Sequence, residues 1–250
     1  MPRWLAGPAD VFRAAERWLL PGQCLGCHQR VGRVADDSLV CAVCRSRWLR
    51  LPFPQCPRCG QPVDADTECR VCREWPAGLS GVASAVWLDP SARKTVHLLK
   101  YEGWHRIGHA MTEPIVVLGA LAGGGVLIPI PLGAARLQIR GYNQSAKLAH
   151  AISGKTGLPV NETALFRGRE TRTQTTLTPE EREANLRDAF GVAGAAPERV
   201  VLVDDVFTTG ATLVSAARAL LSGGARAVTA VTFARAELPL AAVSRTTGHY

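Results

Sequence analysis

The chain has 250 residues, a length that accommodates one sizeable α/β domain and a smaller module. Its formal charge of +8 at pH 7 favours anionic partners such as nucleotides, phosphates or nucleic acid. No stretch is long and apolar enough for membrane insertion. Charged residues interrupt the first 20 residues, so this segment is not expected to be the apolar core of a signal peptide. Together these features predict a cytoplasmic protein.

The first 20 residues have the pattern of an amphipathic helix. One helical face collects the apolar residues Val11, Phe12, Ala15, Trp18 and Leu19. We expect this helix to pack on the rest of the protein rather than to lie on a membrane surface. With the cysteine-rich stretch that follows, it forms the first predicted domain, residues 1–77, and residues 78–250 form the second.

Every cysteine of the chain belongs to a CxxC pair, and the pairs are Cys24/Cys27, Cys41/Cys44, Cys56/Cys59 and Cys69/Cys72. This spacing can direct both sulfurs of a pair to one metal ion, and a tetrahedral site needs two pairs. The pattern predicts two structural Zn²⁺ sites of four thiolates each. Pairing between neighbouring motifs is favoured over an interleaved arrangement, but the sequence leaves both open. Eight thiolates contribute −8 and two zinc ions +4, which would lower the formal charge to +4.

Three alternatives compete with this zinc assignment. Disulfides are disfavoured because the chain has no export signal, and a thioredoxin-like redox pair is disfavoured because four tandem pairs lack a flanking βαβ unit. His28 follows Cys27 and could compete as a ligand, but we expect it on the surface. The cysteine-rich module has a small apolar core, so its metal is expected to supply folding energy.

From residue 78 onward, strand and helix patterns alternate. Strands are predicted over residues 82–88, 126–130, 164–166, 190–193 (an edge strand), 200–203 and 227–233. Helices are predicted over residues 91–101, 105–121 with an interruption near Pro114, 142–156 and 212–221. Residues 167–186 are polar and predict a long loop. The alternation predicts a mostly parallel sheet that binds ligands at the carboxyl ends of its strands.

The stretch from Arg199 to Thr212 carries the clearest ligand signal. The apolar run 200–203 ends in two carboxylates, Asp204 and Asp205, which suit a diol such as that of a ribose. The following loop and helix start provide free backbone N–H groups and a favourable helix dipole for a phosphate. The residues of this predicted phosphate loop are Thr208, Thr209, Gly210, Ala211 and Thr212.

Basic residues in three other segments are candidates for anion contacts, namely Lys100, Arg136, Arg140 and Arg169. Two of them follow a predicted strand end at Ile130 and Pro131, where unusual backbone geometry could grip a pyrophosphate. The alternatives that involve no ligand are that the arginines are solvated surface charges and that the Lys100 side chain extends along an apolar helix face. Asn143 and Gln144, which follow these arginines, could equally serve only as helix caps.

The order of four motifs resembles the ComF family, and the motifs are LLKY, IPIPLGAARLQIRGYNQ, RETRTQTTLTPEEREANLRDAF and VLVDDVFTTGAT. The CxxC pairs resemble the double zinc ribbon of that family, so the resemblance spans roughly residues 21–234. It implies a type I phosphoribosyltransferase fold preceded by a zinc-ribbon module, binding of PRPP (5-phosphoribosyl 1-diphosphate) with Mg²⁺, and a role in DNA uptake during natural transformation. By the same resemblance, Asp204 and Asp205 contact ribose hydroxyls, residues 208–212 hold the 5′-phosphate, and Ile130 and Pro131 mark the pyrophosphate loop.

Three functions remain open at this stage. The first is phosphoribosyl transfer, although Thr208 stands where purine-salvage relatives often have an aspartate, and a threonine cannot act as a base at neutral pH. The second is a non-catalytic module for nucleotide or single-stranded DNA, with DNA-uptake or helicase proteins as partners. The third is a PRPP-sensing regulator. The oligomeric state is unknown. Aromatic candidates for base stacking are Trp48, Phe53, Trp75, Trp87, Trp104 and Tyr142.

Overall fold

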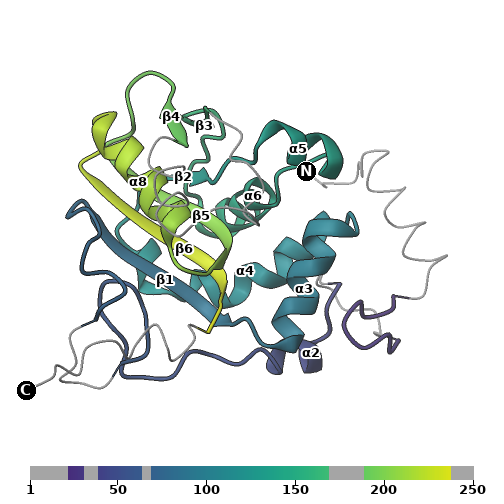
Figure 1. Ribbon diagram of the computed structural model, residues 1–250. Coiled ribbons are helices and arrows are strands. Elements are labelled where there is room, and N and C mark those ends of the chain that lie inside the picture. The colour runs from purple at the N-terminus through teal and green to yellow at the C-terminus, as the bar shows by residue number, and fades with distance from the viewer. Residues whose placement is uncertain (1–21, 31–38, 64–68, 169–188, 238–250) are drawn as a thin grey trace, which may run out of the picture.

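A four-stranded parallel sheet organises the larger part of the molecule (Figure 1). The computed structural model describes residues 22–30, 39–63, 69–168 and 189–237, so the predicted helix in the first 20 residues and most of the predicted loop 167–186 lie outside the described residues. The sheet has the order β1-β6-β5-β2. Its strands are β1 (Leu79–Trp87), β6 (Ala227–Arg235), β5 (Arg199–Phe207) and β2 (Val126–Pro129).

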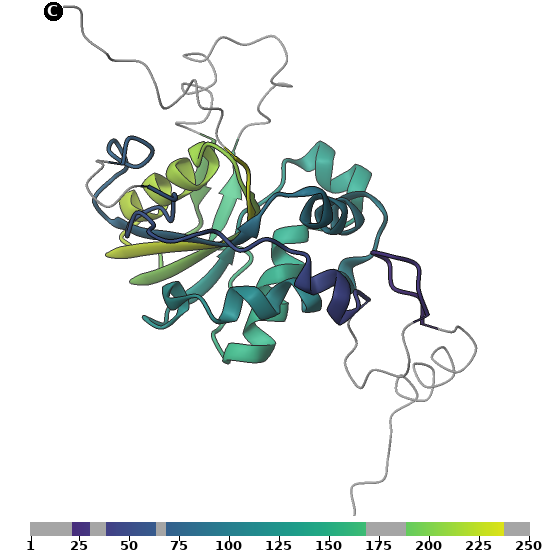
Figure 2. The same ribbon diagram turned by 90° about the horizontal axis from the view of Figure 1, so that it is seen from below.

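Helices cover both faces of this sheet, which is why its central strands are continuous apolar runs (Figure 2). Helix α8 (Ala211–Ser222) packs on one face, and α4 (Gly108–Val116) and α6 (Gln144–Thr156) pack on the other. Residues 200–203 of β5 are accordingly buried. Because all four strands run parallel, their carboxyl ends meet at one edge of the sheet. Within the described residues, no helix combines the length and apolar character needed to cross a bilayer.

The helix signals in the sequence correspond to capping interactions. Helix α3 (Pro90–Tyr101) begins with proline at its first position, and the side chain of Asp89 accepts a hydrogen bond from the Ala92 N–H. Helix α6 begins after Asn143, whose side chain accepts from the Ser145 N–H, and it ends at Gly157 with φ +74°. The predicted capping role of Asn143 is confirmed.

Other predicted helix boundaries are wrong. The single helix expected over residues 105–121 is three elements, η1 (His105–Ile107), α4 and η2 (Gly119–Leu121). Pro114 lies inside α4, which continues to Val116, so the interruption comes after the proline and not at it. Helix α5 (Ala134–Arg140) was not predicted, because none of its residues is buried and it therefore has no apolar periodicity.

The two shortest strands also differ from their predicted place. Strands β3 (Leu165–Arg167) and β4 (Phe190–Val192) pair only with each other, antiparallel, as a separate two-stranded sheet. Strand β4 is therefore not an edge strand of the main sheet. The pair packs instead beside α8, where a Cβ on Gly223 would lie 3.1 Å from the nearest atom of Val192.

The first cysteine module packs on the α3 and α4 side of the larger domain. It includes the short helix α2 (Ala42–Ser46). Lys94 of α3 donates to the Gly26 carbonyl at 2.6 Å, and Arg45 forms an ion pair with Glu113 of α4 at 2.5 Å. Trp48 is buried with its ring edge-on to Phe233 of β6, at a centroid distance of 4.9 Å. The module therefore shares one apolar core with the sheet.

The second cysteine module is joined to the sheet by a buried arginine, Arg235, at the end of β6. Its guanidinium donates to the Cys59 carbonyl at 2.8 Å and to the Gln61 side-chain oxygen at 2.9 and 3.1 Å. The same guanidinium lies 4.0 Å from the ring centroid of Phe207. Since Phe207 is the last residue of β5, this arginine connects the module to the segment that precedes the predicted phosphate loop.

We predict that Arg235→Met destabilises the protein by about 3 kcal/mol, because the substitution removes the donor of the buried Cys59 carbonyl and of the half-buried Gln61 side-chain oxygen. Urea unfolding measures the change. Arg226→Met is the matched control, since Arg226 is an exposed arginine that pairs with exposed Glu198, and it should shift stability by less than about 0.5 kcal/mol. Equal effects of the two substitutions would contradict the prediction.

Candidate functional site

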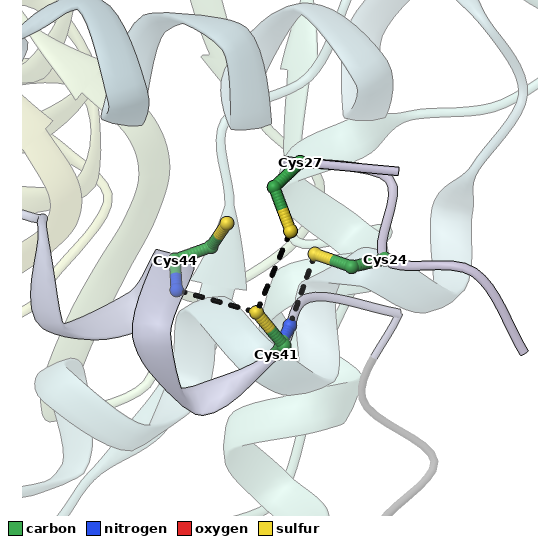
Figure 3. Close-up of side chains that lie close together, drawn as sticks. All are labelled: Cys24, Cys27, Cys41 and Cys44. Carbon is green, nitrogen blue, oxygen red and sulfur yellow. Dashed lines mark hydrogen bonds between the residues drawn. The ribbon is translucent and has the colours of Figure 1, made fainter. Parts of the chain in front are cut away.

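The cysteines gather into two clusters. One consists of Cys24, Cys27, Cys41 and Cys44, and the other of Cys56, Cys59, Cys69 and Cys72, with the sulfurs of each within 4.8 Å of one another. Figure 3 shows the four sulfurs of the first cluster converging on one point. The predicted pairing of neighbouring CxxC motifs is confirmed. His28 is exposed and lies outside the cluster, as expected.

The sulfur spacing fits zinc. Four thiolates at a Zn–S distance of about 2.3 Å form a tetrahedron with edges of about 3.8 Å. The observed Sγ–Sγ distances are 3.9 Å for Cys27 and Cys41, 3.6 Å for Cys56 and Cys72, and 3.4 Å for Cys59 and Cys69. Both clusters therefore suit structural zinc, which would cross-link each module and leave no open coordination position for a substrate.

The surroundings of the thiols differ within each cluster. Burial alone would raise the pKa of Cys24, but backbone N–H groups of Cys41, Cys27 and Gly26 outweigh it and lower that pKa to about 6. Burial followed by the neighbouring thiols raises the pKa of Cys44. The second cluster repeats this contrast, with the pKa of Cys56 lowered to about 7 and that of Cys72 raised to about 12. Four crowded thiols resist ionising together, and a divalent cation removes that resistance.

The acidic pair lies inside β5 rather than after it, because this strand extends to Phe207. Asp204 stands opposite Thr232 of β6. Asp205 is only 2% exposed, and both of its oxygens are engaged. Lys100 lies 2.5 Å from its Oδ2, and Gln144 donates to its Oδ1 at 3.2 Å. Lys100 therefore neutralises a carboxylate that would otherwise be buried without a counter-charge.

Asp204 is the more accessible member of the pair. Its Oδ1 accepts hydrogen bonds from the Ser145 hydroxyl at 2.8 Å and from the Asp205 N–H at 2.9 Å. Burial, and then the neighbouring charge of Asp205, raise the pKa of Asp204 to about 7, while Ser145 and Lys100 act in the opposite sense. Two adjacent carboxylates are thus held so that one of them stays close to protonation at neutral pH.

The predicted phosphate loop leads directly into the N-terminus of α8, which begins at Ala211. Gly210 precedes the helix with φ +82° and has no side chain that could cap it, and the Ala211 N–H donates to the Thr209 hydroxyl at 3.4 Å. Thr208 and Thr209 are exposed. The N–H groups of the first turn and the helix dipole favour an anion at this point.

Crowding fixes the course of this loop. A Cβ on Gly210 would lie 2.9 Å from ring atoms of Phe207 and 3.1 Å from a ring atom of Trp75. The backbone N–H of Trp75 donates to the carbonyl of Cys72 at 3.2 Å. The second cysteine module therefore contacts the loop in two ways. Trp75 packs against Phe207, and Arg235, which donates to Cys59, lies over the ring of Phe207.

The first turn of α6 connects the acidic pair to the segment after β2. Asn143 donates to the Ile130 carbonyl at 3.0 Å, and the Ile130 N–H donates to the Val203 carbonyl at 3.0 Å. The next two residues, Gln144 and Ser145, hold Asp205 and Asp204. The motif IPIPLGAARLQIRGYNQ ends in Asn143 and Gln144, for which the sequence predicts no role beyond capping, and it predicts no role for Ser145. The signal that could have identified them is a run of polar residues at a helix start. In the structure, Gln144 and Ser145 of this run are buried and hold the acidic pair.

The structure brings three of the four candidate basic residues together. Lys100, Arg136 and Arg140 all line one cavity of about 280 Å³, and Lys100 also contacts Asp205. Arg169 lies outside the described residues. Among the aromatic candidates, Trp48 is buried in the core, whereas Phe53 and Trp104 are exposed. Tyr101, which sequence analysis did not consider as a stacking residue, is 67% exposed beside the cavity.

Comparison with known families agrees with this two-part organisation. Residues 15–73 match the double zinc ribbon domain, and residues 104–241 match the phosphoribosyl transferase domain. With its parallel sheet and two four-cysteine clusters, the chain is a type I phosphoribosyltransferase-fold protein with an N-terminal double zinc ribbon.

The chain belongs to the ComF family, as the similarity of its relatives shows. It is 32% identical over 218 residues to DNA utilization protein YhgH of Escherichia coli (strain K12), which covers 84% of this chain and 95% of that protein. It is 28% identical over 201 residues to competence protein ComFC of Bacillus subtilis, covering 75% and 80%. It is 37% identical over 204 residues to competence protein F of Haemophilus influenzae, covering 76% and 87%.

We predict two zinc ions per chain in the purified protein, and one in Cys24→Ser or Cys59→Ser, because each substitution removes a thiolate from one cluster only. Elemental mass spectrometry measures the ratio of zinc to protein. His28→Ala is the control and should retain both ions, since His28 is outside the cluster. Loss of a zinc ion in that control would contradict the assignment of the ligands.

We also predict that Asp204→Asn stabilises the folded protein most at high pH. The pKa of Asp204 is raised on folding, from about 4 to about 7. The wild-type protein therefore loses stability as pH rises through this window, by up to about 4 kcal/mol, whereas the asparagine does not titrate. Chemical unfolding of both proteins from pH 4 to pH 8 tests this. The advantage of the variant should shrink towards pH 4, and a constant difference would refute the prediction.

Proposed function

We propose that this protein binds PRPP or a related ribose 5-phosphate at the carboxyl edge of its main sheet, in a process that handles DNA. The observation that carries the proposal is the joint placement of Asp204 in β5 and the N-terminus of α8, which follow each other through a single loop. A carboxylate can accept hydrogen bonds from a ribose diol, and a helix N-terminus can hold the 5′-phosphate.

Within this proposal, separate groups of residues bind the phosphate, the ribose and the diphosphate of the ligand. Residues 208–212 hold the 5′-phosphate through backbone N–H groups and threonine hydroxyls. Asp204 contacts the ribose diol directly, and Asp205 orders the site by holding Lys100 and Gln144. The segment at Ile130 and Pro131 faces the diphosphate. The remaining anion contacts come from Lys100, Arg136, Arg140 and Arg169. Magnesium enters with the diphosphate, which supplies most of its ligands together with water.

The proposed biological setting comes from the relatives. Their names refer to DNA utilization and competence. We therefore propose that ribose-phosphate binding serves DNA uptake or use in the cytoplasm, alongside single-stranded DNA or proteins that process it. Transfer of the ribosyl group is a further step, for which the site offers positioning and charge stabilisation. Thr208 provides no general base at neutral pH, so an acceptor of the ribosyl group would have to be reactive without a base at this position.

Binding is tested first by calorimetric titration with ribose 5-phosphate and with PRPP and Mg²⁺. We predict that Gly210→Ala weakens ribose 5-phosphate binding at least tenfold, because the new Cβ collides with Phe207 and Trp75 and displaces the loop. Gly194→Ala is the matched control. Gly194 has a similar φ of +75° with nothing within 4 Å of an added Cβ, so it carries the same backbone strain without the collision.

Three outcomes separate the candidate functions. Failure of the wild-type protein to bind either ligand, or equal effects of the two glycine variants, would refute the proposed site. Release of pyrophosphate from PRPP that depends on an added acceptor and exceeds an Asp205→Ala background would establish transfer, and binding without release would leave a sensor or coupling protein. Binding of single-stranded DNA that persists in Asp204→Ala would locate a DNA function outside the ribose-phosphate site.

A further inference from the structure

We infer that zinc in the second four-cysteine cluster regulates the phosphate loop, and that zinc in the first cluster does not. Zinc in the second cluster orders residues 208–212, and a ligand on this loop in turn holds that zinc more tightly. The effect on ligand affinity rests on the proposed function. The ordering of the loop does not, because it can be measured with no ligand present.

Trp75 makes the first connection between the second cluster and the loop. Its backbone N–H donates to the Cys72 carbonyl at 3.2 Å. Its ring lies 6.1 Å from the ring of Phe207, centroid to centroid, and a Cβ on Gly210 would lie 3.1 Å from it. Trp75 is therefore bonded to the cluster through its backbone and packs beneath the loop through its ring.

Arg58 fixes the position of this tryptophan relative to the cluster. It is one of the two residues inside the third CxxC pair. Its guanidinium donates to the carbonyls of Cys72 at 2.9 Å, Trp75 at 3.0 Å and Pro76 at 2.7 Å. These bonds tie the segment that follows the fourth CxxC pair to the third pair. A metal ion held by both pairs would hold Trp75 in the same arrangement.

Arg235 makes the second connection, and it is an electrostatic one. This arginine is fully buried over the ring of Phe207. Burial disfavours the charge of its guanidinium, and the thiolates of Cys59, Cys69 and Cys56 favour it. Four thiolates around one Zn²⁺ keep a net negative charge, which is the counter-charge that a buried arginine needs. Loss of the metal lets the thiols take up protons, so burial of Arg235 against Phe207 becomes more costly.

The first cluster lies on the other side of the sheet. Cys24 and Cys44 belong to the apolar core that contains α4 and α6, whereas Phe207 belongs to the core that contains α8. Trp75 packs both against the α8 core and against the apolar residues of the second cluster. The first module is joined instead to α3, α4 and Phe233. Its zinc therefore acts on the face of the sheet that does not carry the loop.

The coupling between the second zinc and the loop is reciprocal. If zinc raises the affinity for ribose 5-phosphate by some factor, ribose 5-phosphate must raise the affinity for zinc by the same factor. Couplings between two sites in one protein are typically about 5-fold to 150-fold. The ribose-phosphate site would accordingly respond to the supply of zinc through one of the two ribbons.

The test exposes the full-length zinc-loaded protein to a zinc chelator and iodoacetamide, with and without ribose 5-phosphate. Alkylation marks each cysteine that loses its metal, and peptide mass spectrometry measures it at every position. Ribose 5-phosphate should slow alkylation in the second cluster about tenfold and leave the first unchanged. The first cluster is the internal control, because it meets the same reagents. Equal slowing in both clusters, or none in a protein that binds ribose 5-phosphate, would overturn the inference.

Phe207→Leu and Phe233→Leu form a matched pair of variants. Both phenylalanines are buried, but Phe207 contacts Trp75 and Arg235, whereas Phe233 contacts Trp48 of the first module. Each variant should retain two zinc ions by elemental mass spectrometry. Phe207→Leu should lose most of the protection by ribose 5-phosphate, and Phe233→Leu should keep it. Equal protection in the two variants would show that these contacts do not carry the coupling.

Hydrogen exchange without ligand separates this inference from the proposed function. Backbone amides of residues 208–214 should exchange about tenfold faster in Cys59→Ser than in Cys24→Ser, while residues 148–152 of α6 report any global unfolding. Equal loop exchange, in a chain whose wild type binds ribose 5-phosphate, would sink the inference alone. Faster loop exchange in Cys59→Ser, in a chain whose wild type does not bind ribose 5-phosphate, would sink the proposed function alone.

Discussion

The burial of two adjacent carboxylates at the edge of a parallel sheet is the constraint on which the site depends. Asp204 and Asp205 lie at consecutive positions of β5, where their charges repel in a medium that screens them poorly. The fold meets this cost by surrounding the pair with donors. Lys100 and Gln144 hold Asp205, Ser145 holds Asp204, and the pKa of Asp204 rises to about 7. The start of α6 and the end of α3 must therefore converge on this edge for the domain to fold.

The zinc ribbons contribute to the same edge from outside the sheet. The second cluster contacts the phosphate-loop segment at two points, because Trp75 packs against Phe207 and Arg235 joins Cys59 to the same ring. Among the described residues, the apolar cluster of this module is small, so we expect a metal cross-link between its four cysteines to stabilise both contacts. A metal ion with no role in chemistry can in this way determine the shape of a ligand loop.

Sequence patterns could predict the central parts of this architecture. The valine-rich run before Asp204, the capping residues of α3 and the CxxC spacing each rest on local chemistry, and each corresponds to an observed element. The patterns failed where tertiary contacts decide. Helix α5 has no buried face and so no periodicity, and strand β5 continues through two aspartates whose low strand propensity is offset by Lys100 and α6. Buried polar residues such as Gln144 and Ser145 show their importance only when their partners are known.

Lys100 also links the acidic pair to the cavity beside it. Lys100 stands between them, with its ammonium on Asp205 and its stem along the cavity that contains Tyr101. An anion in the cavity would compete with Asp205 for this ammonium, and it would also offset the positive charge of Lys100, which lowers the pKa of Asp204. Protonation at the acidic pair and anion binding in the cavity are therefore coupled through one lysine. The direction follows from charge alone, because an added negative charge beside Lys100 favours the protonated form of Asp204 and so disfavours the ionised form that a ribose diol would meet.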